Sequence, residues 1–209
     1  MSGSADDQIF HDGWLERDNA HLEVRLLGLD PAPTRIVEAP LDLTLADLHR
    51  VIQAAMGWAS EHLYEFVVGG LPFTDQPELD ADGFPENEPW GLDAAGVTLA
   101  DFQTDAPSFS YRYDFGDNWR HEVRFLKHFK RRPGQPLRPA VIDGRGACPP
   151  ENVGGVEGYL ALLEQIAAPE HPDHQGALEW VGGAFDPDAF DVEAADARLA
   201  GVFASGAVG

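Results

Sequence analysis

The residues best suited to chemistry lie between Tyr111 and His121, where two carboxylates and an imidazole follow one another closely. Asp114, Asp117 and His121 are of the types that bind divalent metal ions or act as general acid and base. The alternative is a structural corner of aromatic residues with His121 satisfied in the core. That alternative is favoured because Asp114 and His121 are expected to project from opposite faces of a hairpin, so a single cluster is not predicted.

A second candidate region is the stretch from Asp143 to Gly155, which is rich in glycine and proline. It leads to an expected helix near Val156, and backbone N–H groups at a helix start can receive an anion. The Lys-Ser/Thr ending of a phosphate-binding loop is absent, so a scaffold loop packed on the hairpin is preferred. Cys148 and Glu151 lie here, and Cys148 has no evident histidine partner to activate a catalytic thiol.

A pair of histidines near the C-terminal third has the spacing of metal ligands. His171 and His174, beside Glu170 and Asp173, could serve zinc or manganese. Because Pro172 favours a helix start at this point, surface histidines are the preferred interpretation.

An acidic stretch from Glu78 to Gly83 resembles the first half of an EF-hand calcium loop. Counted from Glu78, position twelve is Pro89, where that loop needs a bidentate glutamate. The match fails, and only a weak cation site remains. The sequence also lacks the G-x-S-x-G and G-x-G-x-x-G patterns of hydrolases and dinucleotide-binding proteins.

The charge balance restricts the partners. The chain of 209 residues has 36 Asp and Glu against 14 Lys and Arg, a net charge of −22. Such a field repels nucleic acid and anionic membranes and favours cationic partners such as metals or basic proteins. A nucleic-acid footprint, if present, is confined to one basic stretch, formed by Lys127, Lys130, Arg131, Arg132 and Arg138.

Cysteine content and hydropathy indicate a cytoplasmic protein. The single cysteine excludes an intrachain disulfide and a CxxC zinc or redox motif. The N-terminal residues are polar, and no apolar run approaches the length that spans a bilayer. We therefore expect no membrane partner.

The first half of the chain predicts a hairpin, a helix and a strand. Alternating apolar residues indicate a strand over 21–29, and a return strand begins at Arg35. An apolar stripe at helical spacing follows Thr44, a candidate N-cap, and ends at Gly57, a candidate C-cap. Residues 63–68 indicate a third strand. This order suggests a β-grasp-like beginning, followed by a long surface loop over 71–93.

The strongest later signal is an antiparallel hairpin over 108–126. A three-residue loop, Gly116 to Asn118, places all aromatic side chains on one face and opposite charges across the strands on the other. Asn118 tolerates the left-handed conformation that such a loop needs. The predicted facing pairs are Phe115 with Trp119, Tyr113 with His121, Tyr111 with Val123, and Phe109 with Phe125.

The remainder predicts a long loop over 130–155 and helices over 156–167, over 173–181 and from 191 to 203. These helices are expected to cover a face of the sheet, which makes the chain an α+β protein. We expect one domain over residues 9–203, with a disordered N-terminus over 1–8 and a disordered tail over 204–209.

Several blocks resemble the plasmid pRiA4b ORF-3-like family, whose members are also met as passenger proteins of insertion elements. The blocks are Leu43 to Trp58, His62 to Phe66, Tyr113 to His121, Gly146 to Gly155, and Trp180 to Phe190. The resemblance implies an α+β domain and brings no established activity. Because members of this family occur with mobile elements, the resemblance suggests a link to DNA transactions, but by association only.

The chain departs from the family pattern at two places. Thr34-Arg35 stands where relatives often have Trp-Arg, and Tyr64 stands where they often have a second histidine. If those residues form a site with His62 and His121, this chain has lost part of it.

Three functions are compatible with these patterns. The preferred one is a non-enzymatic interaction or regulatory module with a protein partner, associated with mobile elements. The first alternative is a metal-dependent hydrolytic enzyme using a divalent metal, with metal ligands from His62, Asp117 and His121. Its full candidate site is His62, Asp114, Asp117, His121, Cys148 and Glu151. The second alternative is a DNA-binding accessory protein that uses the basic stretch.

Overall fold

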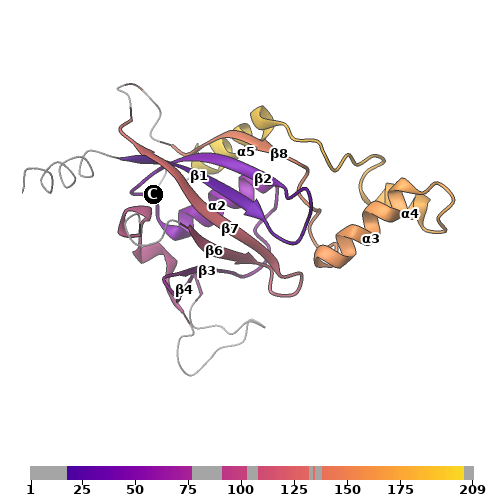
Figure 1. Cartoon of the computed structure of the whole chain (residues 1–209), viewed down its shortest axis with the longest axis horizontal. Helices are drawn as coiled ribbons and strands as arrows, with labels where there is room; N and C mark the ends of the chain where they lie inside the picture. The colour runs from indigo at the N-terminus through magenta and orange to yellow at the C-terminus, as the bar shows by residue number, and fades with distance from the viewer. Residues whose placement is uncertain (1–17, 77–90, 103–107, 132–133, 135–137, 205–209) are drawn as a thin grey trace, which may run out of the picture.

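The computed structural model describes residues 18–76, 91–102, 108–131, 134 and 138–204. An eight-stranded sheet forms its centre, in the order β5-β4-β3-β6-β7-β1-β2-β8 (Figure 1). All neighbouring pairs are antiparallel except β4 and β5, which are parallel. The strands are β1 (Asn19–Leu26), β2 (Thr34–Pro40), β3 (Tyr64–Val68), β4 (Leu71–Thr74), β5 (Leu92–Asp93), β6 (Ser108–Tyr113), β7 (Trp119–Phe129) and β8 (Ala140–Arg145).

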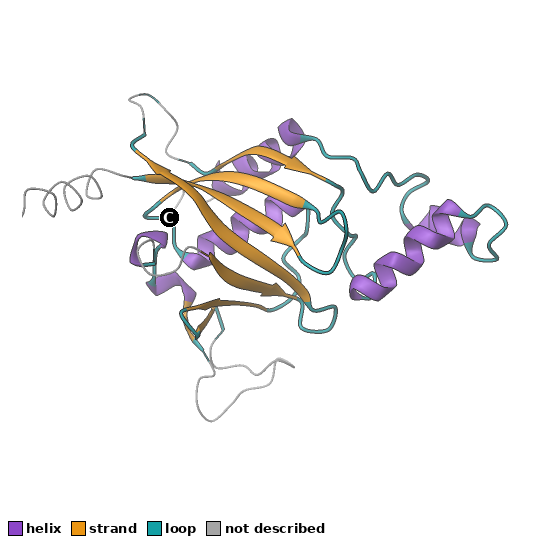
Figure 2. Ribbon diagram, in the orientation of Figure 1, coloured by secondary structure: helices purple, strands orange, loops and turns teal. Residues whose placement is uncertain are grey.

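Two helices cover one face of this sheet. Helix α2 (Leu45–Met56) and helix α5 (Val192–Ala204) pack on each other behind the strands, and α5 also contacts β8 (Figure 2). The strands alternate accordingly, so that Leu22 and Val24 of β1 are fully buried while Arg25 is exposed. The opposite face carries cross-strand ion pairs, including Arg25 with Glu122 and Arg124 with Glu23. The α+β class is confirmed.

The hairpin–helix–strand beginning is confirmed. Thr44 accepts a hydrogen bond from the Asp47 N–H at 3.0 Å, as an N-cap does, and Gly57 ends α2 in the left-handed conformation, with φ of +96°. In the sheet, however, β3 does not lie beside β1 or β2. The hairpin β6–β7 is inserted between them, and β1 pairs with β7 over its whole length.

Two predicted loops contain strands. The segment 71–93 contributes β4 and β5, and the segment 130–155 contributes β8 at the sheet edge. These strands are short and lack the clear alternation that marks β1 and β6, which is why the sequence did not signal them. The N-terminal residues 1–8 and the EF-hand-like stretch from Glu78 to Pro89 lie outside the described residues. Ala204, the first residue of the expected tail, is the last residue of α5, and residues 205–209 lie outside the described residues.

The predicted hairpin register is wrong by two residues. Tyr113 pairs with Trp119 and Tyr111 pairs with His121, so five residues, 114–118, form the turn. The Asp114 carboxylate accepts hydrogen bonds from the Gly116 and Asp117 N–H groups at 2.9 and 3.2 Å, which removes these donors from the ladder. Asn118 does adopt the predicted left-handed conformation, with φ of +56°, and so does Asp114 at +54°. Because the error is even, the side chains within β6 and β7 keep their predicted faces, whereas Phe115 lies in the turn, where the Arg112 guanidinium covers its ring.

Helices α3 (Gly155–Ala167) and α4 (His174–Trp180) pack on each other beyond the end of the sheet (Figure 1). We call residues 155–181 the helical arm. Its first turn docks on two strand connections: a Cβ at Gly28 would meet Val156 at 3.0 Å, and one at Gly155 would meet the Asp117 carbonyl at 2.6 Å. Among the residues that the structure describes, no helix is both long and apolar enough to cross a bilayer.

Candidate functional site

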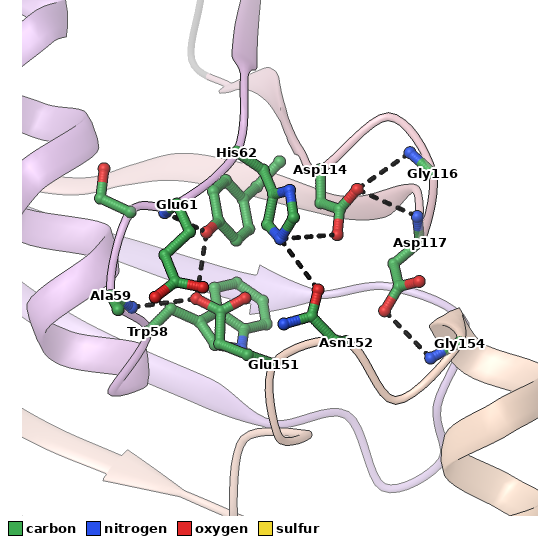
Figure 3. Close-up of polar contacts among 12 residues, drawn as sticks. Trp58, Ala59, Glu61, His62, Asp114, Gly116, Asp117, Glu151, Asn152 and Gly154 are labelled. Carbon is green, nitrogen blue, oxygen red and sulfur yellow. Dashed lines mark hydrogen bonds and ion pairs between the residues drawn. The ribbon is translucent and has the colours of Figure 1, made fainter. Parts of the chain in front are cut away.

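Three loops that are far apart in sequence meet at the end of the sheet beside the helical arm (Figure 3). We call them the three-loop junction: residues 57–63 after α2, the β6–β7 turn 114–118, and residues 146–154 before α3. Hydrogen bonds and one His–carboxylate contact join all three. Four of the six candidate residues meet here, namely His62, Asp114, Asp117 and Glu151.

His62 joins each of the other two loops through one ring nitrogen. Its Nε2 donates to the Asn152 Oδ1 at 3.0 Å and lies 3.5 Å from the Asp114 Oδ2 (Figure 3). The His62 side chain is one-third exposed, whereas Asp114 is nearly buried. A histidine oriented by a carboxylate can act as a general base. The Ser60 hydroxyl, two residues before His62, is hydrogen-bonded to His49 instead. Ser60 is therefore not placed as a nucleophile that His62 could activate.

Glu151 and Tyr113 form a second link in the junction. The Tyr113 hydroxyl donates to Glu151 Oε1 at 3.0 Å and accepts from the Glu61 N–H at 3.0 Å. The same Glu151 oxygen accepts from the Ala59 N–H at 2.9 Å. The other Glu151 oxygen, Oε2, is buried and has no hydrogen-bond partner in the described part of the chain. Burial raises the pKa of Tyr113 well above its usual range, so this phenol stays protonated and keeps donating.

Asp117 connects the β6–β7 turn to the helical arm. Its Oδ2 accepts from the Gly154 N–H at 3.1 Å, directly before α3 begins. A carboxylate at a helix start is favoured by the unpaired N–H groups there and by the helix dipole. The anion-binding position that the sequence suggested near Val156 therefore has an internal carboxylate beside it.

His121 and Cys148 do not join this group. His121 is fully buried, lies edge-on to Trp58 at 5.5 Å, and neither ring nitrogen has a partner among the described residues. Burial lowers its pKa to about 3, so it is neutral. Burial also raises the pKa of the Cys148 thiol far above its usual range, which keeps it protonated and unreactive.

The proposed metal set of His62, Asp117 and His121 is therefore not assembled. Over the described ranges, no group of three or more His, Cys, Asp or Glu side chains lies close enough to hold a metal ion. His171 and His174 also have separate partners. The His171 Nδ1 accepts from the Asp173 N–H, and the His174 Nδ1 donates to the Gln165 carbonyl. As expected, α4 begins here, at His174.

Two of the five residues of the basic stretch are paired with carboxylates through their side chains. Lys130 lies 3.5 Å from Asp18, and Arg138 forms a bidentate pair with Asp196 at 2.8 and 3.0 Å. Lys127 lies over the Phe129 ring. The Arg131 backbone N–H donates to Asp18, and Arg132 lies outside the described residues.

Sequence reasoning missed two buried polar residues beside the junction. His49 is stacked on Tyr64 at 3.8 Å, and its Nδ1 accepts from the Tyr111 hydroxyl at 2.8 Å. Arg35 is 2% exposed, and its guanidinium lies 4.0 Å from the Phe190 ring centre. Their positions gave a signal: His49 lies on the apolar face of α2, and Arg35 shares strand parity with Val37. Thr34 and Tyr64, the two departures from the family pattern, are both buried.

Changing Asp114 to alanine is expected to reduce the free energy of unfolding by about 1–3 kcal/mol. The change removes the acceptor for two N–H groups of the turn and the partner of His62, and it places alanine at φ of +54°. Urea denaturation measures this loss. Asp114→Asn keeps an acceptor and tolerates the left-handed backbone, so it should stay within about 1 kcal/mol of wild type. An Asn variant as unstable as the Ala variant would contradict the capping role.

Acid should destabilise the protein through its two buried histidines. Burial lowers the pKa of His49 and of His121 to about 3, against about 6.5 in the unfolded chain. Between these values the unfolded state binds protons that the folded state excludes. Stability is therefore full above about pH 6.5 and falls towards pH 3, by about 1.4 kcal/mol per pH unit for each histidine.

Urea denaturation between pH 8 and pH 4 measures this dependence. His121→Leu should remove about half of the part of the pH dependence that is due to the two buried histidines. An unchanged slope in His121→Leu would exclude His121 as a contributor.

The structure is thus an α+β protein with a pair of helices, the helical arm, at the end of its sheet. The connections at Gly28 and at Asp117, far apart in sequence, hold the start of this arm. Residues 18–194 match the sequence model of the protein family described as plasmid pRiA4b ORF-3-like protein. The chain belongs to this family, as the resemblance of its sequence blocks predicted.

Two relatives show how far the similarity extends. The chain is 40% identical over 166 residues to the uncharacterized protein y4hQ of Sinorhizobium fredii (strain NBRC 101917 / NGR234). The aligned region covers 77% of this chain and 79% of that protein. It is also similar to the crystal structure of MM3350, a protein of unknown function from Methanosarcina mazei Go1. That structure has 32% sequence identity and a TM-score of 0.73, over 85% of this chain and 97% of the other.

Proposed function

We propose that this chain is a non-catalytic protein-interaction module with a regulatory role, associated with mobile elements, and that the helical arm is its binding surface. The observation that carries the proposal is an open groove of about 580 Å³ between α3 and α4, with Trp180 at its side. Trp180 is 52% exposed, and large aromatic residues are the side chains most enriched where proteins bind one another.

The three-loop junction supports this assignment because its carboxylates bind backbone N–H groups of the surrounding loops. Asp114 holds the β6–β7 turn, Glu151 holds the residues after α2, and Asp117 holds the start of α3. Each of these three carboxylates joins two segments of the chain or holds a turn through hydrogen bonds to backbone N–H groups. The junction thus fits a rigid support for the arm.

One observation favours a second candidate, a metal-dependent hydrolytic enzyme. The His62–Asp114 pair lies at a partly exposed position and could supply two ligands or a general base. Further ligands would have to come from outside the described residues or from a substrate. The DNA-binding alternative has less support, because Lys130 and Arg138 are already paired with acids.

The experiment is affinity capture from cells of the source organism, followed by mass spectrometry, with wild type, Trp180→Ala and Leu126→Ala. Leu126 is a matched control because it is 46% exposed but lies on β7, away from the arm. We expect a partner retained by wild type and Leu126→Ala and lost from Trp180→Ala. A stoichiometric metal in the purified protein that is lost in His62→Ala would favour the enzyme instead.

A further inference from the structure

The groove between α3 and α4 has a floor of small residues. Gly158 and Ala161 of α3 face Gly176 and Ala177 of α4, and Trp180 and Asp173 lie at the α4 side. Small side chains on both helices leave room for a bulky group from outside. A Cβ at Gly176 would meet nothing within 4 Å. The groove is therefore open to a ligand side chain at Gly176, whereas at Gly158 the backbone carbonyl of Val153 occupies the place of a side chain.

Trp180 gives this groove an apolar contact surface. Its side chain is about half exposed, and no aromatic ring of the described residues packs against it. A tryptophan buries a large area at small conformational cost when a partner covers it. A partner side chain seated over the small residues would contact the Trp180 ring.

The charge around the groove selects the partner. Between Arg145 and Arg198 the sequence has no lysine or arginine. The helical arm has five carboxylates in this cation-free stretch, namely Glu157, Glu164, Glu170, Asp173 and Glu179, and of these Asp173 lines the groove itself. Negative potential next to an apolar groove attracts a segment with lysine or arginine beside an apolar anchor. It also disfavours a second copy of this chain, because both copies carry a net charge of −22.

We propose that the α3–α4 groove binds a basic amphipathic segment of a partner protein, with a bulky apolar side chain over Ala161 and Gly176 and with lysine or arginine facing the acidic arm. This proposal rests on the proposed function and adds the chemistry of the partner. An amphipathic helix laid into a groove is a common way to bind a segment of this kind.

Fluorescence anisotropy with two labelled peptides tests the partner chemistry. Both peptides have the same leucine and tryptophan positions in a helical pattern, and their polar positions are all lysine in one and all glutamate in the other. We expect the lysine peptide to bind, the glutamate peptide not to bind, and affinity to fall as salt is raised from 50 to 500 mM, because salt screens exposed charges.

Variants of the full chain locate the binding site. Trp180→Ala should weaken the lysine peptide about tenfold or more, as loss of a central aromatic contact does. Ala161→Trp, which fills the groove without changing charge, should weaken it similarly. Leu126→Ala should bind as wild type. Circular dichroism and thermal denaturation confirm that each variant is folded.

Three results would overturn the proposal. The first is no binding of the lysine peptide, and the second is equal binding by wild type, Trp180→Ala and Ala161→Trp. The third is self-association in sedimentation experiments that is lost in Trp180→Ala, which would make a second copy the occupant. If the peptides fail while the capture experiment still yields a partner dependent on Trp180, the partner chemistry is wrong and the proposed function stands. If both fail, the proposed function falls as well.

Discussion

Replacing Arg35 by alanine is expected to lower the free energy of unfolding by about 3–5 kcal/mol. The guanidinium is almost fully buried and donates to three backbone carbonyls, those of Ala55, Thr34 and Arg145, each at 2.9 Å. These carbonyls belong to α2, β2 and β8, so one side chain joins a helix to the sheet edge. Alanine would leave the three acceptors unsatisfied and would remove the contact with Phe190.

Guanidinium denaturation measures this effect, and two further variants define its cause. Arg35→Lys should restore less than half of the lost stability, because an ammonium group cannot reproduce the planar fork of donors. Arg25→Ala removes an exposed arginine one strand away, which is paired with Glu122, and should cost less than about 1 kcal/mol. A loss for Arg35→Ala as small as that for Arg25→Ala would show that the buried hydrogen bonds contribute little.

Gly155→Ala is expected to cost about 2–4 kcal/mol and to loosen the helical arm. Gly155 begins α3 with φ of +69°, and its Cβ would lie 2.6 Å from the Asp117 carbonyl oxygen. Because that oxygen belongs to the backbone of the β6–β7 turn, it can move only if the turn or the arm moves. The arm should therefore lose part of its contact with the junction.

Denaturation and hydrogen exchange separate a global from a local effect. Loss of amide protection confined to α3 and α4 is expected, with the sheet amides less affected. Gly201→Ala in α5 is the matched control, since its Cβ would meet nothing within 4 Å and alanine favours a helix by up to about 1 kcal/mol. A Gly155→Ala protein as stable as wild type would mean that the close approach to Asp117 is not needed for docking.

These two residues explain how the proposed binding surface depends on distant parts of the chain. Arg35 fixes the sheet edge to α2, and Gly155 fixes the start of α3 to the β6–β7 turn. A groove between two short helices would be weakly defined without such support, since isolated short helices are marginal in water. We therefore expect Gly155→Ala to weaken peptide binding without touching the groove.

Much of the local structure could be predicted from the sequence. The apolar spacing from Leu45 to Ala55 and the caps Thr44 and Gly57 define α2, and each cap forms as predicted. The alternation over 108–126 identified the β6–β7 hairpin and the buried face of its aromatic residues. These features depend on neighbours in sequence, for which periodicity and capping rules are sufficient.

The hairpin register shows where local rules stop. Pairing opposite charges favoured a three-residue loop, but Arg112 pairs with Arg120 because the Asp114 carboxylate binds the turn N–H groups. Backbone donors satisfied in the turn outweigh exposed charge pairs, which contribute little in water.

The candidate site residues were not all brought together, for a similar reason. The sequence determined the residue types, the acidic balance, the helices and the face that each strand residue occupies. Only the tertiary structure decided that His62 lies beside Asp114 and Asn152, whereas His121 is buried in the core and Cys148 packs against it. The same holds for the open groove between α3 and α4. Contacts between loops separated by tens of residues depend on how the whole sheet assembles, and no local period or spacing carries that information.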